Sequence, residues 1–172
     1  VEVNNENSKD SNSFINKSLS NLIFLPEMER LFQSNPSNRR NFIDRLIFSE
    51  RIDYNQLINK YKKKLLERSK IIRENKIDDA WIKIIENEIS EIGIKIYQLR
   101  NLQLDILNNN INILNKSNNY NLNIKIHLKD NFYSKDLDVD KFNVHLKNSR
   151  EFDKHFGGSK IGPHKSDFIV LV

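Results

Sequence analysis

The chain has 172 residues, of which 30% are charged, with a formal net charge of +5 and no cysteine. Its length allows a core of ordinary size, and the lack of cysteine excludes a disulfide framework and thiolate chemistry. No apolar run reaches the roughly 18 residues of a membrane span, and the first residues lack the basic and apolar parts of a secretory signal, so we expect a soluble, cytoplasmic protein.

The first third of the chain contains several short predicted elements. Ser13 can cap a short helix, and the apolar run 22–25 has the character of a buried strand. Residues 27–32 can form one helical turn. Asn35 followed by Pro36 then predicts the start of a longer helix, because proline at the first helical position loses no needed donor.

Two amphipathic helices are predicted in the middle of the chain. Asp53 is the expected N-cap of the first, and both helices have apolar stripes at three- and four-residue steps. The stripes should face each other in an antiparallel hairpin of residues 54–74 and 79–115. Trp81, near the turn of this hairpin, is better explained by packing at the tip than by stacking on a base. The stripe residues are Tyr54, Ile58, Tyr61, Leu65, Ser69 and Ile72, then Ile85, Ile89, Ile92, Ile96, Leu99 and Ile106.

The last third should return through a strand, a helix and a second strand. Residues 122–128 alternate between apolar and polar, as in a half-buried strand. A third helix is predicted over 139–153, and Gly157 and Gly158 should end it. The run 168–172 is apolar and β-branched, which favours a strand inside a sheet. The inward-facing residues of the third helix should be Phe142, Leu146 and Phe152.

The positive charge of the chain is concentrated on the first long helix. Eight basic and three acidic residues lie between Asp53 and Lys76, whereas the two signs balance elsewhere. Lys60, Lys64 and Arg68 follow one another at four-residue steps beside the apolar stripe, so they could meet the phosphate groups of a nucleic acid. A solvated helix face is the plainer explanation of the same residues.

Two short motifs do not follow from core patterning. The segment 38–46 places two adjacent arginines, an apolar step and an Asp-Arg pair within a turn and a half of helix. In the segment 159–167, a Gly-Pro turn is followed at once by histidine, lysine and aspartate, where a strand begins.

In this order and spacing, the two motifs resemble RecF, the bacterial recombination-repair ATPase related to SMC and Rad50 proteins. The resemblance covers nearly the whole chain but only the middle of the family's pattern. Two positions depart from it: Lys165 stands where the family more often has arginine, and Gly158 stands where a basic residue is expected. The matching residues are Pro26, Glu27, Arg39, Arg40, Phe42, Asp44, Arg45, Arg150, Asp153, Gly162, Pro163, His164, Lys165 and Asp167.

The resemblance implies a mainly α fold with α+β character at its ends. It would be a long antiparallel helical hairpin arm, with short helices and a few strands that belong to an ABC-type ATPase head. The implied division is a head-derived segment over 1–35, the helical arm over 36–116, and a strand-helix-strand return to the head over 117–172.

The resemblance also implies a function in DNA replication, repair and recombination. RecF proteins bind single-stranded DNA and junctions of single- and double-stranded DNA, form ATP-dependent dimers, and act with RecO and RecR to load RecA onto gaps. Full-length members use ATP and Mg²⁺. The residues expected to contact DNA here are Lys60, Lys64, Arg68, Arg39 and Arg40.

The parts that would handle ATP are missing from this sequence. It has four glycines and no G-x-x-x-x-G-K-[ST] loop, no signature loop and no acidic strand end for Mg²⁺. We therefore expect an internal piece of a longer protein that does not hydrolyse ATP alone and holds no cofactor itself.

Other readings of the sequence are weaker. The four histidines are scattered, without a carboxylate cluster of metal-ligand spacing, so neither a metal site nor catalytic residues are predicted. A protein-protein interaction module built on the hairpin, without DNA binding, is the main alternative. A helix lying on a membrane is less consistent with the stripe, which lacks a bulky Trp-Phe-Leu face.

Overall fold

The structure is a computed structural model that describes residues 26–74, 78–119 and 123–172. The predictions of a helix after Ser13, a strand at 22–25 and the link at 75–77 lie outside the described residues. The elements in chain order are the 3-10 helix η1 (Pro26–Gln33), α2 (Pro36–Glu50), α3 (Asp53–Arg73), α4 (Asp79–Asn118), β1 (Lys125–Lys129), α5 (Val139–Asn148), α6 (Arg150–Phe156) and β2 (Asp167–Leu171). A mainly helical chain with a few strands was predicted; the mainly helical character is confirmed, and the described ranges contain two strands.

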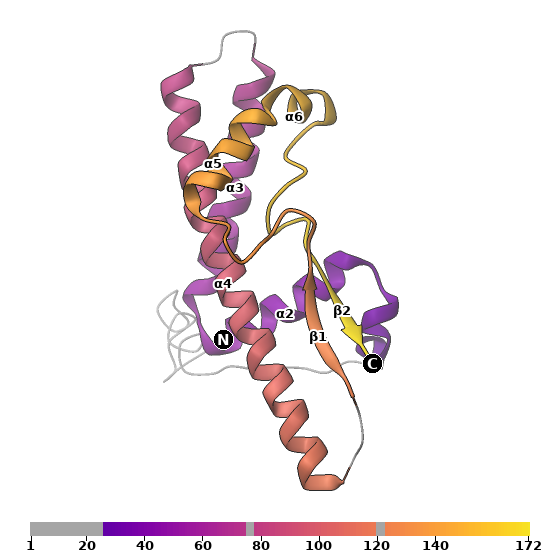
Figure 1. Cartoon of the computed structure of the whole chain (residues 1–172). Helices are drawn as coiled ribbons and strands as arrows, with labels where there is room; N and C mark the ends of the chain where they lie inside the picture. Colours follow the sequence, from indigo (N-terminus) through magenta and orange to yellow (C-terminus); the bar gives the residue numbers. More distant parts are fainter. Residues whose placement is uncertain (1–25, 75–77, 120–122) are drawn as a thin grey trace, which may run out of the picture.

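The helices α3 and α4 lie side by side and run in opposite directions (Figure 1). At 1.5 Å per residue, the 21 residues of α3 span about 30 Å and the 40 residues of α4 about 60 Å. Therefore α4 continues well beyond the start of α3. The part of α4 that extends beyond α3 packs against α2 and β1, whereas α5 packs on the part of α4 that α3 covers.

Helices α2 and α4 each begin with a side-chain cap. The Asn35 side chain accepts a hydrogen bond from the backbone of Asn38, which caps α2. Asp78 likewise caps α4 by accepting from the backbone of Trp81. The prediction that Asp53 caps α3 is wrong, because Ile52 holds that position without a side-chain bond. Asp53 lies instead in the first turn, where a carboxylate favours the positive end of the helix dipole.

The third predicted helix is divided into two. α5 ends at Asn148, and α6 begins at Arg150 after a break at Ser149. The Ser149 hydroxyl donates a hydrogen bond to Asp153 of α6, 2.7 Å away. The Asp153 carboxylate points inward and is buried. Phe152 was expected to face inward, but the residue is 51% exposed, because Asp153, bonded to Arg68, holds the inward position on α6.

The buried apolar residues form two clusters along α4. One joins α3, α4 and α5 around Tyr61, Ile85, Ile89 and Phe142, and the other joins α2, the start of α3, α4 and β2 around Phe168. The expected stripes supply much of both clusters. Trp81 is 46% exposed, so it does not belong to either.

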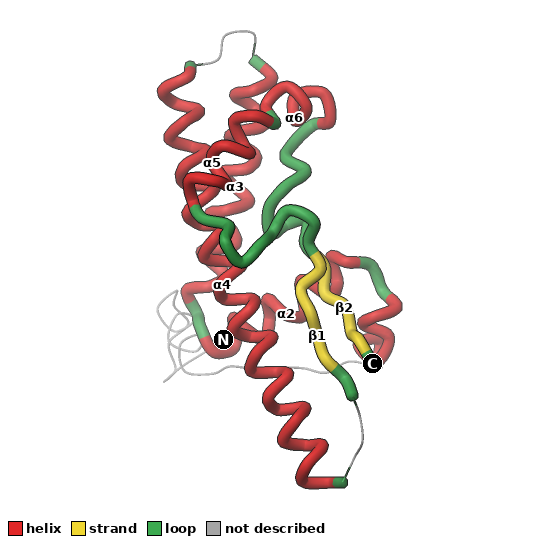
Figure 2. Tube along the Cα trace, in the orientation of Figure 1, coloured by secondary structure: helices red, strands yellow, loops and turns green. Residues whose placement is uncertain are grey.

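The sheet contains two antiparallel strands, with Lys125 opposite Leu171 and Lys129 opposite Asp167. Figure 2 shows these strands beside α2 and the continuation of α4. Asn108 of α4 exchanges two hydrogen bonds with the backbone of Ile126, which holds β1 against the helix. None of the helices in the described ranges is long and apolar enough to cross a bilayer.

Candidate nucleic-acid interface

The two sequence motifs meet in space, although more than a hundred residues separate them. Arg39 of α2 donates to both carboxylate oxygens of Asp167 at the start of β2, with N–O distances of 2.7 and 2.8 Å. Its remaining nitrogen donates to the carbonyls of Phe32 and Ser34. This hydrogen bond from Arg39 lowers the pKa of Asp167 below its usual value. Arg39 is thus bonded within the protein rather than free, which disfavours the predicted DNA contact.

A second arginine-carboxylate pair ties α2 to α4. Arg100, which is 3% exposed, donates to both oxygens of Asp44 at 2.9 Å. It also donates to the carbonyl of Pro163 and to the hydroxyl of Ser166, so one guanidinium joins both motifs. Tyr54 completes the group by donating to Asp44 at 2.6 Å. Sequence analysis missed Arg100, although an arginine continuing the apolar stripe of α4 is a signal for such a buried role.

His164 of the second motif is a structural residue. Its Nε2 lies 2.9 Å from the carbonyl oxygen of Ser159, and its Nδ1 lies 3.2 Å from the Tyr61 hydroxyl. Because the carbonyl can only accept, Nε2 carries the proton and Nδ1 accepts from Tyr61. Burial lowers the pKa of His164 to about 4, so the ring is neutral at physiological pH. Gly162 has φ +114°, and a Cβ there would collide with the Tyr61 hydroxyl.

Arg68 was expected on a DNA-binding line, and the structure contradicts this. Its side chain is 1% exposed and donates to Asp153 at 2.7 Å, to Glu86 at 3.0 Å and to the Leu146 carbonyl at 2.6 Å. Arg150 donates to both oxygens of Glu86 from the other side. The family-motif residues Arg150 and Asp153 thus hold α6 against α3 and α4.

The other residues of the predicted line have different environments. Lys64 pairs with Glu88 at 2.6 Å and with Glu67 at 3.2 Å, and these bonds raise its pKa. Its charge is therefore largely compensated, contrary to the expectation that it is free to meet phosphates. Lys60 is exposed, as predicted. The predicted line fails because side chains at successive four-residue steps shift gradually around the helix. Arg68, two steps after Lys60, therefore points into the core instead of lying on the flank.

Three exposed lysines line a groove between α3 and the segment that joins α6 to β2. The groove has a volume of about 410 Å³, and no acidic residue lines it. Lys62 of α3 faces it from one side, with Lys160 and Lys165 from the other. Phe156, 59% exposed, lines the same groove, and the Lys160 ammonium lies 5.8 Å from its ring centre. We call these four residues the basic groove.

Two features extend the apolar character of the basic groove. Phe152 packs on Phe156 with ring centres 4.3 Å apart, and Leu66 of α3 lines the groove with 66% exposure. Lysines interleaved with exposed aromatic rings are the surface that single-stranded nucleic acid requires, because phosphates meet cations while bases stack. Sequence analysis did not single out Lys160 or Phe156, because only folding brings them beside α3.

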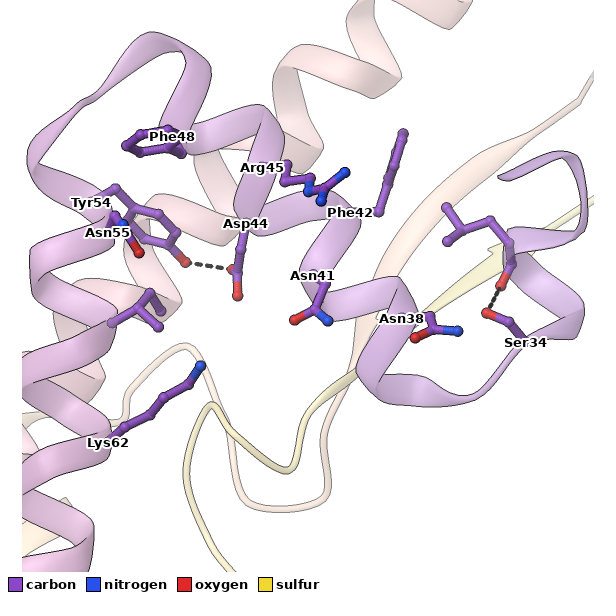
Figure 3. Close-up of a pocket in the computed structure, with 12 residues that line it drawn as sticks. Ser34, Asn38, Asn41, Phe42, Asp44, Arg45, Phe48, Tyr54, Asn55 and Lys62 are labelled. Atoms are coloured by element: carbon purple, nitrogen blue, oxygen red, sulfur yellow. Dashed lines mark hydrogen bonds between the residues drawn. The ribbon is translucent and has the colours of Figure 1, made fainter. Parts of the chain in front are cut away.

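A second hollow, of about 550 Å³, separates α2 from α3 (Figure 3). Asp44 is the acidic residue that lines it, and this carboxylate is already bonded to Tyr54 and Arg100. Neither a nucleophile beside a base nor a pair of carboxylates is found there. In the described part of the chain, no three His, Cys, Asp or Glu residues come together as metal ligands.

Fold and surface together define a helical pair that is joined to a small sheet and carries a basic, partly aromatic groove. No protein-family model matches the chain. It is 32% identical over 166 residues to the DNA replication and repair protein RecF of Rickettsia bellii (strain OSU 85-389), an alignment that covers 95% of this chain and 46% of the relative. RecF of Rickettsia conorii (strain ATCC VR-613 / Malish 7) is also 32% identical, over 165 residues.

A solved structure of the recombination mediator protein RecF with ATP, described as part of the RecFOR pathway, superposes with a TM-score of 0.70. The match covers 86% of this chain and 42% of that one, at 24% identity, and shows that the two share a fold. The resemblance to RecF is therefore confirmed over nearly the whole chain. The chain spans about half the length of the curated relatives that it matches.

Proposed function

We propose that this chain is the DNA-contacting limb of a RecF-like replication and repair protein. In this proposal, the limb extends from an ABC-type ATPase head that binds ATP and Mg²⁺ and dimerises. The whole protein would bind single-stranded and gapped duplex DNA in the cytoplasm and help RecO and RecR to load RecA. The similarity to RecF proteins along 95% of the chain supports this role.

The basic groove is the observation that supports the proposal of DNA contact. Lys160 and Lys165 bring two positive charges to one depression that no carboxylate lines, and Lys62 lies between this depression and a cavity beside α2. Phe156 is 59% exposed in the same place, where a base can stack. This surface replaces Arg39, Lys64 and Arg68 as the proposed interface.

The test is the salt dependence of binding to a single-stranded oligonucleotide. Each phosphate contact contributes about 0.7 to the slope of log K against log salt for single strands, so Lys160→Ala/Lys165→Ala should reduce the slope by roughly 1.4. Lys125→Ala/Lys129→Ala removes two exposed lysines of β1, outside the groove, and should leave the slope unchanged. Equal slopes for the two double variants would exclude the groove as the interface.

A substitution of the aromatic ring tests the stacking part separately. Phe156→Ala should weaken oligonucleotide binding by about 1–3 kcal/mol, with the salt slope unchanged, because stacking involves no counterion. Its exposure predicts little loss of folding stability. A parallel loss of affinity and melting temperature would show a structural role for the ring instead.

The alternative is a protein-protein interaction module. The exposed apolar residues Leu66, Phe152 and Phe156 lie together and could dock a partner protein. Binding to RecR without affinity for DNA at low salt would favour this function. Under either proposal the isolated chain should not hydrolyse ATP, because its sequence lacks the required loops, and measurable turnover would contradict this.

A further inference from the structure

One half-buried arginine differs from the others in its electrostatic environment. In the described ranges, the other buried or half-buried arginines each pair with a carboxylate. They are Arg39, Arg68, Arg100 and Arg150. For Arg40, the structure shows one hydrogen bond, from Nη1 to the Ser166 carbonyl at 2.8 Å, and within the same ranges no ion pair.

The surroundings of Arg40 disfavour its positive charge. Burial and the positive charge of Arg100 both lower the pKa of Arg40, whereas the pKa values of the paired Arg39 and Arg100 are raised. The nearest carboxylates, Asp44 and Asp167, are each already bonded to another arginine. Asp167 and Asp44 therefore offset only part of the cost of holding this partly buried cation, and an additional anion beside it would stabilise it.

Arg40 lines a cavity of about 200 Å³ between α2, α3, α4 and the Pro163–His164 turn. Lys62 of α3 lines it as well, and Figure 3 shows its side chain reaching toward Asn41 and Asp44 of α2. Asp44 is bonded to Arg100, and in the described ranges neither Arg40 nor Lys62 forms an ion pair, so two positive charges face this space. His164 also borders it but is neutral, and both its ring nitrogens are engaged.

The size and chemistry of the cavity select the ligand. Pockets for drug-sized molecules have volumes of roughly 300–1,000 Å³, so this cavity suits a small ion or one group of a larger ligand. The arginine fork matches the oxygens of a phosphate group, and a lysine ammonium adds a second charge. We propose that the cavity binds a single phosphate group, held by Arg40 and Lys62. The group belongs either to a free phosphate compound or to a nucleic acid backbone.

The test measures binding of inorganic phosphate to the whole chain at constant ionic strength, from the Nε–Hε signals of arginine in ¹H–¹⁵N spectra. Arg40→Gln should weaken the binding at least about tenfold. The matched control Arg45→Gln removes an exposed arginine of the same helix and should bind as the wild type does. Ser37→Asp is a second variant, which needs no arginine to be removed. It places a carboxylate one turn before Arg40 in the same cavity and should also weaken phosphate binding.

A second arm distinguishes the two sources of the phosphate. If Arg40→Gln also weakens binding of a single-stranded oligonucleotide, the group belongs to a nucleic acid. If oligonucleotide binding is unchanged while inorganic phosphate binding is lost, the ligand is a free phosphate compound. Absence of saturable phosphate binding to the wild type, or equal binding by Arg40→Gln and Arg45→Gln, would overturn the proposal. The basic groove is tested at Lys160 and Lys165, so the two proposals can fail independently.

Discussion

Replacing Arg68 by methionine should destabilise the protein strongly. The guanidinium lies in the interior and bonds to Asp153, Glu86 and the Leu146 carbonyl. Methionine retains most of the apolar stem but none of the donors. Asp153, itself 1% exposed, would then remain buried beside a single hydroxyl group, that of Ser149.

The magnitude follows from how many partners are lost. Removing one partner of a buried ion pair costs about 3–5 kcal/mol. Glu86 would still be held by Arg150 through both oxygens, so the cost should lie near the lower limit, about 3 kcal/mol. For a chain of this size, 1 kcal/mol corresponds to about 2–4 °C, so the melting temperature should fall by about 6–12 °C.

Urea and thermal denaturation of three variants would check this reasoning. Lys63→Met, on the exposed side of the same helix, should stay within about 0.5 kcal/mol of the wild type. Arg68→Met/Asp153→Leu should be more stable than Arg68→Met alone, because it leaves no unpaired charge at Asp153. A loss below about 1 kcal/mol for Arg68→Met, or a double variant no better than the single one, would refute the argument.

Three further predictions concern the second motif. Because burial lowers the pKa of His164 to about 4, against about 6.5 when unfolded, the unfolded chain binds more protons between these values. Stability should fall by up to about 1.4 kcal/mol per unit as pH drops through this window, and His164→Gln should flatten that part of a urea-denaturation profile. Gly162→Ala should lower the melting temperature, and Tyr61→Phe should recover part of the loss by removing the colliding hydroxyl; no recovery would exclude this clash as the cause. The Arg39 bond lowers the pKa of Asp167, so its stabilisation is complete above about pH 4 and is lost as pH falls through the lower folded value. Arg39→Met should therefore reduce stability at neutral pH and weaken the acid dependence, whereas an unchanged acid limb would show that the pair contributes little.

The elements that sequence patterns predicted correctly are those with strong local signals. Asn35 and Pro36 mark the start of α2, and the three-four stripes mark α3 and α4. The division at Ser149 had no such signal, because residues 139–153 form a continuous helical pattern. On either side of the break, the Leu146 carbonyl and Asp153 both accept hydrogen bonds from Arg68 of another helix, a contact distant in the sequence.

The candidate interface was less predictable. Lys60, Lys64 and Arg68 share a spacing, yet one is exposed, one is paired and one is buried. The spacing describes a line on an isolated helix, and whether that line meets solvent depends on which helices pack beside it. Lys160 and Phe156 reach the interface only because the chain returns to α3 after α6.

Taken alone, the sequence determined the helical character of the chain, the principal helix starts and the resemblance to RecF, because these depend on spacing and on residues close together along the chain. Tertiary structure alone decided the role of each charged side chain. Arg39, Arg40 and Arg45 occupy one short segment, yet the first is bonded within the fold, the second borders a cavity and the third faces solvent. The physical reason is that the free energy of a charge depends on its exposure and on its partners, and residues distant in the sequence supply both.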